Sequence, residues 1–83
     1  MINIQPIINS AIDANKKAYT DAYNRFNEWA KADFSDGSAM EYRIFYRTKM
    51  NTIEETILNM FGKANIEYIE TQFTNIRFDA RNK

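Results

Sequence analysis

The sequence carries apolar side chains at alternating intervals of three and four residues, in three segments that its only two glycines separate. Such spacing returns a side chain to the same face of a helix at every turn, and it is typical of helices that pack against one another. The three rows are Ile8, Ile12, Asn15, Tyr19, Ala22, Phe26 and Trp29; Ala39, Arg43, Tyr46, Met50, Ile53, Ile57 and Met60; and Ile66, Ile69, Phe73, Ile76 and Ala80. They predict an all-α fold.

The first helix is expected over residues 6–31. Pro6 suits the first turn of a helix, where its missing N–H would have no partner, and no other glycine or proline follows within this range. Residues 32–38 then collect Asp, Ser and Gly, which favour turns. These residues are therefore the predicted loop between the first two helices.

The second helix is expected over residues 39–61. Ser38 and Glu41 have the spacing of a capping box, in which each side chain accepts a hydrogen bond from a backbone N–H of the first turn. At the other end, Gly62 can adopt the left-handed conformation that ends many helices.

This second helix is apolar on two sides. At 100° per residue, Met40, Ile44 and Leu58 lie about 120–160° away from Tyr46, which belongs to the main apolar row. A helix of this kind usually contacts two neighbours. We therefore expect it to be the central element between the first and third helices, or to share one face with a second chain.

Residues 66–79 are predicted to form a third helix, with Asn65 as its N-cap. The segment is rich in Ile, Tyr, Thr and Phe, which also favour strands, but its apolar positions do not alternate as they would in a half-buried strand. Two long helices followed by a C-terminal strand or hairpin remain the alternative.

The length of the chain predicts one helical domain over residues 1–83. At this size a single core supplies only about 3–5 kcal/mol of net stability. The sequence contains no cysteine and no histidine, so it can form no disulfide and lacks the usual ligands of structural zinc. We therefore expect a three-helix antiparallel bundle that dimerisation through the first two helices would complete, and hence a homo-oligomer.

Eleven basic and eleven acidic side chains cancel, and they are mixed along the chain. Nucleic-acid binders usually carry a basic excess because phosphate contacts supply much of their affinity, so the zero net charge disfavours a nucleic-acid partner. No segment approaches the roughly 18 apolar residues of a membrane span, and the first residues lack the features of a signal peptide. We expect no membrane partner and a cytoplasmic location, in the host cytoplasm if the protein is phage-encoded.

The absence of histidine and cysteine removes the side chains used most often for general-base and thiol catalysis. Two glycines cannot build a phosphate-binding loop, and no serine lies in a G-x-S-x-G motif. We therefore expect no enzymatic activity, no catalytic or metal-binding residue and no cofactor.

The best candidate for a binding surface is the segment 41–49. Its two arginines are four residues apart and share a helix face, and the aromatic residues beside them could anchor a protein contact. The predicted partner-binding residues are Tyr42, Arg43, Phe45, Tyr46, Arg47 and Lys49. In the alternative interpretation, the tyrosines belong to the core and the arginines are solvated.

The predicted function is that of a small non-enzymatic regulatory protein that binds another protein. Short length and the lack of cofactor chemistry would suit a bacterial or phage accessory protein, such as an inhibitor of a host complex. One alternative is a nucleic-acid binder, in which Arg43, Arg47 and Lys49 contact phosphates while Tyr42 or Tyr46 stacks on a base. The other alternative is a self-assembling structural subunit whose helix faces are its whole function.

Overall fold

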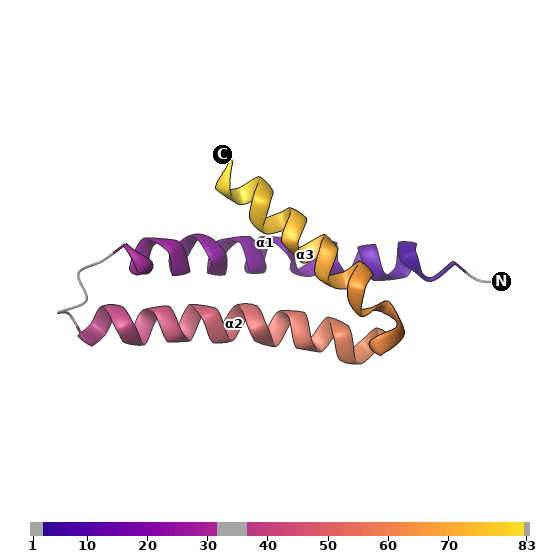
Figure 1. The fold of residues 1–83 in the computed structure, drawn as a ribbon, viewed down its shortest axis with the longest axis horizontal. Coiled ribbons are helices and arrows are strands. Elements are labelled where there is room, and N and C mark those ends of the chain that lie inside the picture. The colour runs from indigo at the N-terminus through magenta and orange to yellow at the C-terminus, as the bar shows by residue number, and fades with distance from the viewer. Residues whose placement is uncertain (1–2, 32–36, 83) are drawn as a thin grey trace.

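The computed structural model describes residues 3–31 and 37–82 and contains three long helices (Figure 1). They are α1 (Gln5–Ala30), α2 (Gly37–Phe61) and α3 (Ile66–Arg81), with a short 3-10 helix, η1 (Lys63–Asn65), before α3. α1 and α2 run antiparallel side by side, and α3 turns back across α1 (Figure 1). The described residues contain no strand, so the all-α three-helix fold is confirmed and the alternative of a C-terminal strand or hairpin is wrong.

The helix boundaries lie within two residues of the predicted ones. α2 begins at Gly37 and not at Ala39, so Ser38 lies inside its first turn. Such shifts of one or two residues are common at helix ends, where the flanking backbone can also adopt helical angles. α3 continues to Arg81, two residues beyond the predicted end. Of the predicted loop, residues 32–36 lie outside the described part of the chain.

The turn between α2 and α3 is built on Gly62. Its φ is +83°, as its predicted role at the helix end requires, and its N–H donates to the carbonyl of Leu58 at 2.8 Å. Asn65 directly precedes α3 as predicted, but its side chain does not cap that helix. The Asn65 amide instead donates to the carbonyl of Phe61 at 2.8 Å, which ties the turn to the end of α2.

The core lies where one face of each helix meets the other two. Its buried members are Ile8, Ile12, Tyr19, Ala22 and Tyr23 of α1, Met50 and Ile57 of α2, and Ile69, Phe73 and Ile76 of α3. At its centre the rings of Tyr19 and Phe73 lie 4.7 Å apart. The predicted rows differ from this core at their ends: Met60 is 63% exposed and Ile66 is 39% exposed, whereas Tyr23, which the rows omit, is buried.

α1, and not α2, is the central helix along most of the molecule. After the turn at Gly62, α3 crosses obliquely over α1 and moves away from α2 toward its own C-terminus (Figure 1). The predicted central position of α2 therefore holds only near its C-terminal end, where Leu58 packs against the core. Met40 and Ile44, on the same side of α2, remain 51% and 60% exposed.

The molecule is elongated. Its principal extents are 55 × 26 × 19 Å, and its radius of gyration is 14.5 Å, compared with about 12 Å for an average compact chain of this length. The α1–α2 hairpin sets the length, and α3 covers only part of it (Figure 1). None of the helices in the described part of the chain is long and apolar enough to cross a bilayer.

Candidate functional site

The six predicted partner-binding residues all lie in the N-terminal half of α2, but the helix directs them to different sides. At 100° per residue, Phe45 lies about 160° from both Arg43 and Arg47. Phe45, Arg47 and Lys49 are exposed, whereas Arg43 is half-buried. The six residues therefore do not form one surface, and their role in binding stays a prediction.

The aromatic residues of this segment contact other aromatic side chains of α1 and α2. Tyr42 stacks on Trp29 of α1, with ring centroids 4.6 Å apart, and it remains 47% exposed. Tyr46 is half-buried against the core and contacts the ring of Phe45 edge to face at 5.0 Å. The alternative interpretation of the tyrosines as core residues is thus right for Tyr46 and wrong for Tyr42.

The other side of the same helical segment carries a separate group of residues, which we call the outer strip: Met40, Arg43, Ile44 and Arg47. They fall within a sector of about 100° on α2. The two apolar members are both more than half exposed, and they alternate along the strip with the two arginines. Sequence reasoning found the arginines but grouped them with Phe45, which lies about 160° from both of them around the helix axis.

The outer strip is the continuation of the surface that α3 covers farther along α2. Glu54 and Leu58 lie in the same angular sector, and Glu54 pairs with Arg77 of α3 at 3.5 Å. Because α3 leaves α2 toward its C-terminal end, it does not reach the outer strip (Figure 1). The exposure of Met40 and Ile44 therefore follows from the path of α3.

The basic residues of α2 do not share one face. Lys49 lies about 120° from Arg43 and about 160° from Arg47 around the helix axis, so it points to a different side of α2 from the two arginines. This geometry does not support the nucleic-acid interface that the sequence left open.

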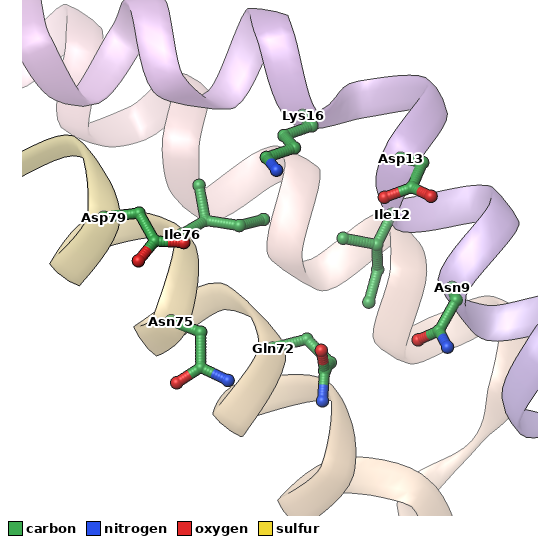
Figure 2. Close-up of a pocket in the computed structure, with 8 residues that line it drawn as sticks. All are labelled: Asn9, Ile12, Asp13, Lys16, Gln72, Asn75, Ile76 and Asp79. Atoms are coloured by element: carbon green, nitrogen blue, oxygen red, sulfur yellow. The ribbon is translucent and has the colours of Figure 1, made fainter.

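A polar crevice of about 300 Å³ lies between α1 and α3 (Figure 2). Ile12 and Ile76 contribute its apolar surface, and polar side chains from both helices surround them, with Lys16 on α1 and Asp79 on α3 (Figure 2). Among the described residues, no group of three or more acidic side chains is arranged to hold a metal ion. The crevice therefore consists of two isoleucines surrounded by polar side chains of both helices.

A partly buried hydrogen-bond network joins all three helices. Arg77 Nη1 donates to the hydroxyl oxygen of Tyr19 at 2.6 Å, and the Tyr19 hydroxyl donates to Glu54 Oε2 at 3.2 Å. Arg77 Nη2 also donates to Thr74 at 3.1 Å. Burial raises the pKa of Tyr19 to about 12, with a smaller contribution from the negative charge of Glu54 and against the hydrogen bond from Arg77.

Two further contacts fasten α3 to α1. Arg81 donates to the hydroxyl oxygen of Tyr23 through Nε at 3.3 Å and through Nη2 at 3.0 Å. Burial raises the pKa of Tyr23, but hydrogen bonds from Arg81 and Asn27 together with nearby positive charge outweigh it and lower the pKa below its ordinary value. Near the other end of α3, the Tyr68 hydroxyl donates to Asn9 Oδ1 at 2.6 Å.

Sequence reasoning missed these tyrosine contacts. Tyr19 was recognised as a core residue, but its partners lie 35 and 58 positions away in the chain, and no local pattern signals such pairs. All three contacts join side chains of different helices. Comparison with protein-family models, with curated proteins and with solved structures finds no match for this chain.

Proposed function

We propose that this protein is a small non-enzymatic regulator that acts by binding another protein through the outer strip of α2. The observation that carries this proposal is the exposure of Met40 (51%) and Ile44 (60%) next to Arg47. An exposed apolar side chain beside an arginine is a typical combination at the centre of protein interfaces, where a few residues contribute most of the binding energy.

The chemistry of the outer strip limits the kind of partner. Met40 and Ile44 are four residues apart and form one apolar ridge, which fits a shallow apolar groove or the apolar face of a helix. Arg47 favours a carboxylate at the edge of that contact. The partner is therefore expected to present apolar side chains bordered by Asp or Glu, in a position comparable to that of α3 farther along α2.

The experiment compares the wild-type protein with Ile44→Asp. A partner is first captured on the immobilised protein from a lysate of the source organism, and its dissociation constant is then measured with purified components. Burying an aspartate in place of Ile44 should weaken binding at least tenfold, which corresponds to about 1.4 kcal/mol.

Phe78→Asp is the matched control because Phe78 is 63% exposed but lies on α3, away from the outer strip. This variant should bind the partner as the wild-type protein does, and both variants should keep the helical circular dichroism spectrum. Equal affinities for the wild-type protein and Ile44→Asp would exclude the outer strip as the binding site.

A further inference from the structure

A second surface of the molecule is an apolar groove between α1 and α2. Its volume is about 610 Å³, and its lining residues are Asn15, Ala18, Phe45, Thr48, Lys49, Thr52 and Ile53. Lys49 is the one charged residue in this lining. Phe45 is 57% exposed there, although it is among the largest apolar side chains of the helix.

The groove lies on the side of the hairpin that α3 leaves uncovered. Lys16 of α1 lines the crevice shared with α3, whereas Ala18 lines the groove shared with α2. Two residues along a helix correspond to a rotation of about 200°, so these two side chains point to nearly opposite sides of α1. The groove is also distinct from the outer strip, because Phe45 and Ile44 lie on different sides of α2.

The exposed area of the chain matches what one subunit of a dimer would contribute. The accessible surface is 6135 Å². A compact monomer of 9.8 kDa exposes about 5,200 Å². The excess of about 900 Å² is close to the roughly 800 Å² that each partner buries in a stable interface of standard size.

We propose that a second copy of this chain occupies the groove, so that two α1–α2 hairpins form a four-helix interface with an α3 on each outer side. A two-fold axis perpendicular to the helices passes near Ala18 and Thr52. Each α1 then packs antiparallel to the partner's α1, and each α2 packs antiparallel to the partner's α2. Such an isologous contact uses the same face of both copies and closes without leaving a free surface.

The residues along this face fit the two-fold arrangement. Phe45 lies seven positions before Thr52, and Met60 lies seven positions after Ile53, so the axis brings Phe45 of one copy onto the position of Met60 in the other. Both side chains are more than half exposed in the single chain. Phe45 of each copy thus covers Met60 of the other.

The middle of the face is made of small side chains. Ala14 and Ala18 lie one turn apart on α1, and the axis near residue 18 brings Ala14 of one copy opposite residue 22, also an alanine, of the other. Because alanine adds little thickness to a helix, two α1 helices can approach each other closely along this row. Residue 18 then lies beside its own copy in the second chain.

The first test uses the absence of cysteine from the natural sequence. Ala18→Cys should form a disulfide-linked dimer on mild oxidation, because residues next to a two-fold axis come within the Cα separation that a disulfide needs, about 4.4–6.8 Å. Lys17→Cys is the matched control, since it is the adjacent exposed position and points away from the groove. Cross-linking of both variants to the same extent, or of neither, would overturn the proposed arrangement.

The second test measures mass by sedimentation equilibrium. The wild-type protein should sediment at twice the 9.8 kDa chain mass, and Phe45→Glu and Met60→Glu should each reduce it to the mass of one chain. Ile44→Glu should remain dimeric because it lies on the outer strip. A wild-type monomer at high concentration would overturn the inference, and so would a dimer that survives both Phe45→Glu and Met60→Glu. Loss of partner binding in Ile44→Asp alone bears only on the proposed function.

Discussion

The guanidinium of Arg77 donates to the hydroxyl oxygen of Tyr19 over 2.6 Å, although the two residues are 58 positions apart and lie on the last and first helices. The same hydroxyl donates to Glu54 of α2, so one phenol group joins all three helices. In a bundle whose third helix crosses the hairpin obliquely, this contact is one of several that hold α3 on the hairpin.

Tyr19→Phe should reduce the free energy of unfolding by about 1–2 kcal/mol, because it removes one hydrogen bond to a charged donor and leaves Arg77 and Glu54 partly desolvated. Urea unfolding followed by circular dichroism measures this change. Tyr42→Phe, at an exposed position, should change stability by less than about 0.5 kcal/mol. Equal losses of stability in the two variants would contradict a role for this partly buried network.

The raised pKa of Tyr19 predicts a loss of stability at alkaline pH. In the unfolded chain Tyr19 ionises near its ordinary value of 10, whereas in the folded protein it ionises at about 12. The unfolded state therefore loses its proton first, and the contribution to stability is fully present below pH 10 and is lost as the pH rises through 12. Its size is on the order of 2–3 kcal/mol, from 1.36 kcal/mol per pKa unit.

The difference in unfolding free energy between the wild-type protein and Tyr19→Phe isolates this effect, because the titration of Tyr19 itself occurs only in the wild-type protein. The difference should shrink between pH 9 and pH 11.5. A difference that is constant over this range would show that Tyr19 ionises equally in the folded and unfolded states.

Gly62→Ala should destabilise the protein by about 1–2 kcal/mol. Its φ of +83° is a backbone conformation that side chains with a Cβ rarely adopt, and no neighbouring atom lies within 4 Å of the added methyl position, so the effect isolates backbone strain. Gly37→Ala is the matched control, because Gly37 has equal space and helical angles. Gly37→Ala should leave stability unchanged or raise it slightly, and thermal unfolding of both variants distinguishes the two effects.

Phe73→Ala should cost about 3–5 kcal/mol, because Phe73 is fully buried and its loss leaves a cavity beside Tyr19. Phe78→Ala removes the same ring from a position on the same helix that is 63% exposed, and it should change stability by less than about 0.5 kcal/mol. Chemical unfolding of both variants measures the contrast. Similar losses of stability in both variants would mean that α3 contacts the hairpin through a different face.

Arg81→Ala should loosen the end of α3 without unfolding the protein. The side chain donates two hydrogen bonds to the hydroxyl oxygen of Tyr23, and this contact ties the last turn of α3 to α1. Hydrogen exchange should become faster for the amides of the last helical turn and stay unchanged at Ile69. Unchanged exchange in the last turn would show that helix propensity alone holds it.

Helical spacing was sufficient to predict the number, order and approximate limits of the helices. The period of the apolar rows depends only on local backbone geometry, and capping and turn residues act over a few positions. The buried faces of α1 and α3 also follow the predicted apolar rows, as Tyr19 and Phe73 illustrate. The helical nature of residues 66–79 also followed from spacing, although their composition favoured a strand.

The direction of α3 could not be read from the sequence. Met40, Ile44 and Leu58 have equivalent positions on one side of α2, yet only Leu58 is covered, because α3 leaves α2 after the turn at Gly62. The division of the predicted binding residues into two surfaces has a different origin, because it follows from their angular positions on α2. The part of α2 that remains exposed therefore depends on how far α3 stays in contact with it.

The sequence by itself determined that this chain forms three amphipathic helices with a core along their apolar rows, because apolar periodicity is a local property. The tertiary structure alone decided the angle at which α3 crosses α1, the contacts of Tyr19 with Glu54 and Arg77, and the exposure of the outer strip and the groove. These features depend on the relative placement of whole helices, which is set by many long-range contacts together and by no single segment.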